Sequence, residues 1–418
     1  MLQNKPTPLG LKKSFGFGDR LGLATPGHLA AANQFGFAPI FAQQSIREMA
    51  RTQRTPEEVM QAAQEALTQA GYSKPWGADA DHLKTPEDVQ RTAAAGFCFF
   101  TIDPSEFVKN DADRMSLDDL ANEVARAERD GVFPAPQWQE FYLHQRFEVG
   151  GGPALRFTRE QLLRAAVKYG RAIAHSAFLA GHIAQANRAR PFEIEVSVDE
   201  TDSPTSALEH LFFGLELKRR NVRVVSLAPR FIGEFEKGID YRGDLRRFEA
   251  SLREQVAIAK FCGPYKLSVH SGSDKFSVYP IIGRVCGDLL HVKTAGTSYL
   301  EALRVAARTA PSLFADIAAY SRGRFETDRK SYHISTTTAD IGALPVFTGP
   351  SEEAIYLDEV PGRQLLHVTF GSVLTLGLDR AGRRFKDTLL ELLHREAGLH
   401  LEFLEKHFVK HLSLLEEG

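Results

Sequence analysis

The sequence of 418 residues contains little cysteine: Cys98, Cys262 and Cys286 are its three thiols. Three scattered thiols are too few for a disulfide framework, and none forms a CxxC pair of the kind that binds zinc. The first residues show no apolar stretch behind their positive charge, which argues against a secretory signal. We therefore expect a protein of the reducing cytoplasm.

Long apolar runs and an excess of one charge are also missing. The longest stretch without an acidic or basic residue, Leu21–Ile46, contains two prolines, a histidine, an asparagine and three glutamines, which would be costly in a bilayer. Lys and Arg number 51 against 53 Asp and Glu, a net charge of −2. We therefore expect neither a membrane span nor a nucleic-acid partner.

No GxGxxG or GxxxxGK[ST] motif follows a predicted strand, which argues against a dinucleotide-binding or P-loop fold. What recurs is a short apolar run, a polar cluster and then a helical pattern. Nearly continuous apolar runs are typical of parallel strands buried on both faces. The strand candidates are 16–24, 36–42, 76–81 (the weakest), 96–102, 192–198, 222–228, 266–270, 289–293, 332–335 and 365–370.

Alternating strands and helices indicate an α/β fold with a parallel sheet. We predict a (β/α)8 TIM-like barrel, formed by residues 1–418 as one elaborated domain, with a helical insertion around residues 105–190 and an additional C-terminal helix over 384–415. Ten strand candidates are two more than such a barrel needs, so one or two must be false. A doubly wound open sheet is the second choice. The four histidines of the C-terminal helix are expected to face solvent.

Polar residues close six of the apolar runs, where active sites of barrels are found. His270 and His291 end or follow consecutive strand candidates, and two imidazoles with one carboxylate are a common set for a divalent metal. We choose Glu236 as the carboxylate because Gly238 allows a tight turn; Glu234 and Glu200 are the alternatives. The competing interpretation of His291 is a core histidine bonded to a backbone carbonyl.

Lys293 lies two residues after His291, so strand alternation puts both side chains on one face. Burying a lysine inside a barrel costs folding free energy unless its charge is paired with an acid or takes part in binding or catalysis. It could bind a carboxylate, transfer protons or form a Schiff base, or it could simply pair with an acid such as Asp274. Asp81, His82 and Asp103 are further candidates for proton transfer, although each could equally belong to a turn.

Four patches resemble the tagaturonate epimerase family, over roughly residues 15–384. They are GADADHLK (77–84), FEKGIDY (235–241), SVHSGSDKF (268–276) and HVKTAGTSYLEA (291–302). The resemblance implies a metal-dependent barrel isomerase that interconverts D-tagaturonate and D-fructuronate, which differ at carbon 4 counted from the ketose end. It carries the metal role to His270, His291 and Glu236, with Zn, Mn, Ni or Co as the ion.

Carbon 4 is one bond too far from the ketone for simple proton removal. Retro-aldol cleavage between C3 and C4 is one route, and transient oxidation by a nicotinamide is the other. For the first, we expect Asp103, His82 and Lys293 to share the proton transfers. Residues expected to contact the substrate, chiefly its carboxylate, are Lys84, Arg230, Lys275, Ser271 and Thr294.

The rival hypotheses are another ketose epimerase or aldolase and a non-catalytic sugar-binding barrel; homo-oligomerisation stays open.

Overall fold

The computed structural model describes residues 4–133, 135, 137–150 and 154–418. Its centre is a closed barrel of eight parallel strands, in which each strand pairs with the next along the chain and β1 pairs with β8. The strands are β1 (Ser14–Gly18), β2 (Ala38–Ser45), β3 (Gly77–Leu83), β4 (Phe99–Ile102), β5 (Glu193–Val198), β6 (Ser226–Pro229), β7 (Lys266–Val269) and β8 (Leu290–Thr294). The predicted (β/α)8 barrel is thus confirmed.

The inside of this barrel is polar, whereas barrel interiors are usually filled by branched apolar side chains. Along β5, Glu193, Glu195 and Ser197 alternate with Ile194, Val196 and Val198, and all six residues are buried. Glu195 accepts a hydrogen bond from Ser226 of β6, while the apolar side chains join the cluster that packs against the surrounding helices. Strands with this pattern appear continuously buried although only one face is apolar.

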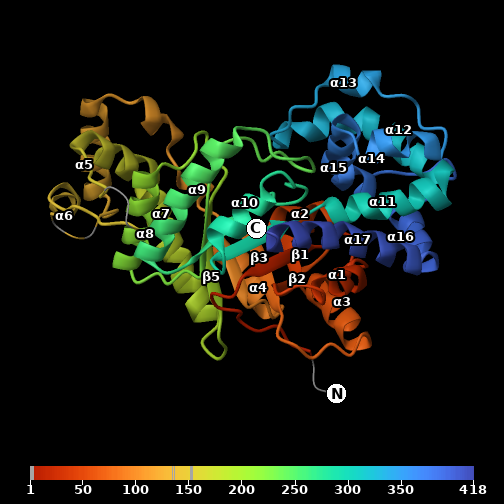
Figure 1. Ribbon diagram of the computed structural model, residues 1–418, viewed down its shortest axis with the longest axis horizontal. Coiled ribbons are helices and arrows are strands. Elements are labelled where there is room, and N and C mark those ends of the chain that lie inside the picture. Colours follow the sequence, from red (N-terminus) through yellow and green to blue (C-terminus); the bar gives the residue numbers. More distant parts are fainter. Residues whose placement is uncertain (1–3, 134, 136, 151–153) are drawn as a thin grey trace.

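Helices follow the strands and cover the barrel (Figure 1). Those between strands are α1 (Thr25–Ala32), α2 (Ile46–Thr52), α3 (Pro56–Gln69), α4 (Pro86–Ala94), α8 (Ala207–Arg219), α9 (Leu245–Cys262) and α10 (Tyr279–Cys286). Several begin at a capping box, in which the side chains of the cap and the third helical residue each accept a backbone N–H. Thr55, Thr85 and Ser206 occupy the cap position in three of them.

The connection from β4 to β5 is the long one, and it lies on the left of Figure 1. It contains η1 (Ser105–Phe107), η2 (Asn110–Arg114), α5 (Leu117–Arg129), α6 (Trp138–Leu143) and the 28-residue α7 (Arg159–Ala186). These elements fall in the interval where a helical insertion was predicted. That the whole chain forms a single domain stays a prediction.

After β8, the chain builds a second helical layer with its own apolar cluster. It consists of α11 (Thr297–Thr309), α12 (Pro311–Asp328), η3 (Arg329–Ser331), α13 (Thr338–Ala343), η4 (Pro350–Glu352), α14 (Glu353–Leu357), α15 (Val360–Thr375) and α16 (Phe385–Arg395). We call α11–α16 the cap; most of it lies at the upper right in Figure 1. The last helix, α17 (Ala397–Glu416), packs beside α1 and α10 on the barrel.

Two of the ten strand candidates are wrong. Residues 365–370 lie inside α15, where they are buried throughout. A short apolar run that is buried on every side has no periodicity that would distinguish a helix from a strand. Residues 332–335 form an irregular segment between η3 and α13.

Within the described residues, none of the helices has both the length and the apolar character that a bilayer span requires; the cytoplasmic location stays a prediction.

Candidate active site

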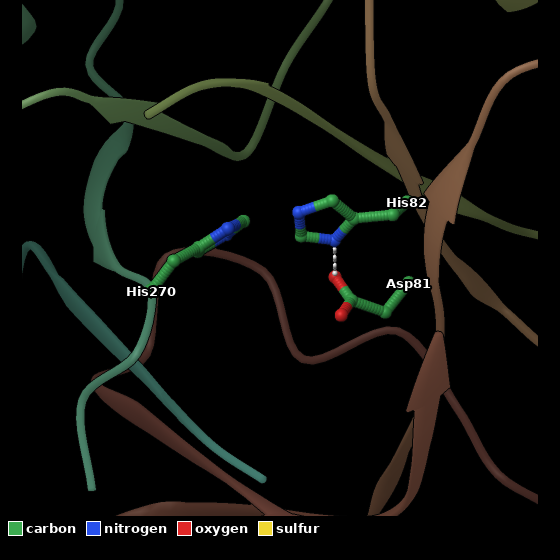
Figure 2. A group of neighbouring side chains, drawn as sticks. All are labelled: Asp81, His82 and His270. Carbon is green, nitrogen blue, oxygen red and sulfur yellow. Dashed lines mark ion pairs between the residues drawn. The ribbon is translucent and has the colours of Figure 1, made fainter. Parts of the chain in front are cut away.

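A bulge at the end of β3 brings two adjacent side chains, Asp81 and His82, to the mouth of the barrel. Ala80 pairs with Phe100 and Leu83 with Ile102, so β3 carries one residue more than β4 between these pairs. His82 has a φ of +56°, a left-handed conformation that is costly for a residue other than glycine. Neighbours on a regular strand point to opposite faces, but here both side chains turn toward His270 (Figure 2).

Asp81, His82 and His270 form a group that could hold a metal ion. One ligand atom from each lies within 4.8 Å of the other two. His82 Nδ1 is 2.9 Å from Asp81 Oδ1, but the alignment is not that of a hydrogen bond, so this buried nitrogen has no hydrogen-bond partner among the described residues. Two imidazoles and a carboxylate at this spacing match the donor set of a divalent transition metal.

Lys293 lies beside this group and is surrounded by acids. Its Nζ is 2.7 Å from Asp79 Oδ2, 2.8 Å from Asp81 Oδ1 and 2.8 Å from Glu195 Oε1. A fourth carboxylate, that of Asp199, approaches to 3.4 Å from His270 Nδ1. Three carboxylates therefore face one ammonium and a fourth faces His270, so negative charge is in excess whenever both imidazoles are neutral.

The pKa values of the site report this excess. Burial alone would lower the pKa of both imidazoles, but the Asp81 carboxylate raises that of His82 to about 9 and the Asp199 carboxylate raises that of His270 to about 10. Burial raises the pKa of Asp79, and the charges of Asp81 and Glu195 raise it further. The ammonium of Lys293 lowers this pKa, and the net value is about 7. A field that keeps protons on two buried imidazoles also favours a bound cation at the same place.

Two of the three predicted metal ligands are not in this group. His291 is level with Ser268, two residues deeper in the barrel than His270, and its Nδ1 lies 2.9 Å from Ser14 Oγ. Glu236 Oε2 accepts hydrogen bonds from Ser335 N (2.6 Å) and Gln364 Nε2 (2.8 Å), which ties it to the cap. The alternatives do not replace it, because Glu234 pairs with His333 and Glu200 with Arg47.

Several predicted substrate contacts are already occupied within the protein. The Lys275 ammonium donates to three backbone carbonyls, those of Glu236, Ile239 and Ser273, and so has no hydrogen left for a substrate. Thr294 Oγ1 donates to Gly16 O at 2.7 Å. Lys84 Nζ lies 3.0 Å from Glu106 and 3.6 Å from Asp103, whose other oxygen accepts Ser105 N–H.

Two cavities meet at His270. The inner one, of about 50 Å³, is lined by Asp81, His82 and Lys293 among others. The outer one, of about 550 Å³, is lined by the predicted substrate residues Arg230 and Ser271 and reaches the segment of the cap that follows α12. The predicted catalytic and substrate residues thus divide into those that border these cavities and those, such as Lys275, that brace the surrounding loops.

A second group, Asp274, His407 and His411, also has ligand atoms within 4.8 Å. His411 is satisfied by protein: Asp274 N donates to its Nε2, and its Nδ1 donates to His407 O. Asp274 Oδ2 accepts from Arg363 at 2.6 Å. This group fastens α17 to the loop after β7. The expectation that the C-terminal histidines face solvent is wrong for His400 and His411, which α17 buries, whereas His394 on α16 is exposed.

Sequence reasoning missed Asp79, Glu195 and Asp199. The alternation Glu-Ile-Glu-Val-Ser-Val in β5 and Ala-Asp-Ala-Asp in β3 signals acids that share one buried face, and it could have identified Asp79 and Glu195. Asp199 follows β5 in a run of acids that looks like a helix cap.

Comparison with known proteins gives one consistent family. The family model of tagaturonate epimerase matches residues 1–415. The tagaturonate/fructuronate epimerase of Thermotoga maritima is 43% identical over 414 residues, which cover 99% of this chain and 82% of that protein. Two crystal structures of the fructuronate-tagaturonate epimerase UxaE from Cohnella laeviribosi, one native and one with glycerol, superpose with a TM-score of 0.90 at 37% and 38% identity, covering 99% of this chain and 83% of theirs. The resemblance of the four sequence patches is confirmed, and the chain belongs to the tagaturonate epimerase family.

Proposed function

We propose that this chain interconverts D-tagaturonate and D-fructuronate with the help of a divalent metal ion held by Asp81, His82 and His270. Family membership and the names of the relatives support the substrates. The observation that carries the metal is the group in Figure 2, in which two imidazoles and a carboxylate meet where negative charge is in excess. This set replaces the predicted set of His270, His291 and Glu236.

The ion would supply Lewis-acid stabilisation of an oxyanion and would orient the hydroxyl and ketone oxygens of the sugar. His82 and His270 would bind it as neutral imidazoles, so their protons would leave as it enters. Glu195 Oε1, 2.7 Å from His270 Nε2, would orient that ring.

The inversion at C4 would proceed by retro-aldol cleavage. The C3–C4 bond breaks, its electron pair stays on the C2–C3 fragment as an enediolate, and the C4 hydroxyl loses its proton to become an aldehyde. The aldehyde then turns its other face toward C3, the same bond re-forms, and the proton returns to the C4 oxygen. All six carbons are retained.

Asp199 would take the proton from the C4 hydroxyl. Burial raises its pKa, but the neighbouring His270 outweighs burial and holds the pKa below its usual range, so the carboxylate is ionised near neutral pH. It borders both cavities. Lys293 is a poorer base than predicted, because Asp79, Asp81 and Glu195 raise its pKa and keep it protonated; it would instead hold Asp81 in place and offset charge. Asp103, bonded to Ser105 N and near Lys84, is left with a supporting role.

Turnover of D-tagaturonate followed by NMR tests this function. We expect D-fructuronate to form, activity to fall after treatment with a chelator, and activity to return with Mn²⁺, Zn²⁺, Ni²⁺ or Co²⁺. Full activity in protein shown to be free of metal would reject the metal. Release of two fragments without epimer would indicate an aldolase, and the absence of any turnover would favour a sugar-binding protein.

A further inference from the structure

A keto-hexuronate carries a carboxylate at the end opposite its ketone, and the residues predicted to bind it are mostly engaged elsewhere. Lys275 holds three backbone carbonyls, and Lys84 pairs with Glu106. Arg230 donates to Thr201 O and lies 4.0 Å from Glu234. Another cation must meet the carboxylate if the proposed substrate is correct.

The two cavities limit where this cation lies. The inner cavity of about 50 Å³ has room for roughly one or two water molecules, since a water occupies about 30 Å³ in the liquid. Only the reacting end of a six-carbon sugar acid fits there, and the remainder must extend into the outer cavity of about 550 Å³. The residues that line both are Arg47, Asp199, Lys237, His270, Ser271 and Tyr332.

Lys237 is the cation of this shared wall for which the described residues supply no acidic partner. It lies in the loop between β6 and α9, is half-buried, and its Nζ donates to Ser271 Oγ, next to His270. Across the described chain, none of the ion pairs within 4.0 Å involves Lys237. Arg47, the other cation of the wall, lies 3.6 Å from Glu200. Of the deeper cations, Arg20 is bound by Glu48 and Lys293 by three acids.

We propose that the Lys237 ammonium binds the carboxylate of the sugar acid, an inference that rests on the function proposed above. A partly desolvated ammonium gains most from a carboxylate when no protein acid competes for it. Ser271, held at a φ of +50° beside His270, positions the ammonium at the boundary of the two cavities. The carboxylate would thus lie in the outer cavity while the reacting carbons face His270.

A lysine also suits the turn of the aldehyde fragment. After the C3–C4 bond breaks, the fragment that bears the carboxylate must rotate without escaping. An ammonium is a compact charge with three rotatable donors, whereas a guanidinium binds a carboxylate in a fixed planar fork. Lys237 would retain the fragment through its charge and let it pivot.

Competition binding to the metal-loaded enzyme tests the proposal. The probes are D-galactonate, an anion, and galactitol, its uncharged counterpart. In Lys237→Met we expect the inhibition constant of galactonate and the KM of D-tagaturonate to rise ten- to a hundredfold, because one charge-assisted hydrogen bond is lost. The inhibition constant of galactitol should not change. Lys330→Met, an exposed lysine of the outer cavity, is the matched control and should leave all three constants unchanged. Lys237→Arg should keep the galactonate affinity but lower kcat.

Other outcomes would overturn the inference. Wild-type turnover with unchanged galactonate binding in Lys237→Met would reject Lys237 and leave the proposed function intact. If Lys237→Met weakens the binding of galactonate and of galactitol equally, the role of Lys237 is structural. If Lys330→Met weakens galactonate binding as much as Lys237→Met does, the effect comes from the overall positive charge of the cavity and not from a direct contact. A wild-type enzyme that neither binds galactonate nor converts D-tagaturonate would reject the proposed function itself.

Discussion

Glu195 Oε1 lies 2.7 Å from His270 Nε2 and 2.8 Å from Lys293 Nζ, so one carboxylate oxygen joins the metal-binding group to the ammonium beside it. Lys293 holds the pKa of Glu195 well below its usual range despite burial, and the carboxylate is therefore ionised. In the barrel, β5 and β8 are separated by β6 and β7, so this link joins strands that are not paired with each other.

Replacing Glu195 should weaken the metal site. Glu195→Gln keeps the size of the side chain but removes its charge, and we expect metal affinity to fall about 10- to 100-fold, as for other partners of ligating histidines. Titration with a fluorescent metal chelator measures this affinity. Glu193→Gln is the control: it is the same change two residues earlier on the same face, where Glu193 accepts Gly10 N–H at the far end of the barrel. Equal metal affinity in both variants would contradict the role of Glu195.

Glu236 should support the cap and not the metal. Glu236→Ala removes the acceptor of Ser335 N and Gln364 Nε2, so we expect the free energy of unfolding to fall by about 1–3 kcal/mol while metal content stays unchanged. Denaturant unfolding together with elemental analysis checks both. Glu234→Ala, which removes the pair with the exposed His333 and the longer contact with Arg230, should cost within about 0.5 kcal/mol. Loss of metal in Glu236→Ala would restore the first hypothesis of a Glu236 ligand.

Buried neutral histidines should make the protein less stable in mild acid. His210 lies between Gln255 and Tyr265, and burial lowers its pKa to about 4. Between pH 6.5 and 4 the unfolded chain binds a proton at this residue that the folded chain does not, so its contribution to stability falls as pH is lowered through 6.5.

The difference between wild type and His210→Gln isolates this effect. Relative to the variant, wild type should lose about 1 kcal/mol of unfolding free energy between pH 7.5 and pH 5.5, measured by urea unfolding at each pH. His144→Gln, a change at an exposed histidine, should follow wild type at both values. A wild-type advantage that does not change with pH would show that the pKa of His210 is the same in the folded and the unfolded chain.

The fold was predictable because its signals are local. Each of the eight strands overlaps a predicted apolar run, and six of the runs are closed by a polar cluster. Thr55 and Thr85 mark the starts of the helices that follow them. Residues 365–370 were wrongly predicted to form a strand, because a helix buried in the cap has no polar side that would show the helical period.

The site was only partly predictable because it depends on the direction of side chains. His270 and Lys293 follow from strand alternation, and each comes directly after a residue of the pair Val269–Val292 that joins β7 to β8. The bulge that turns His82 inward has no signal in Asp81-His82 itself. Gly238 does make the turn that was expected, with a φ of +72°, but the turn points Glu236 at Gln364 of the cap.

Metal content per folded chain tests the central claim most directly. Elemental analysis should be made on wild type, His270→Ala and His291→Gln after dialysis against buffer with the divalent ion and then without it. The account predicts about one ion per chain in wild type, none in His270→Ala and an unchanged content in His291→Gln, because His291 contacts Ser14 below the site. An ion retained by His270→Ala and lost from His291→Gln would contradict it.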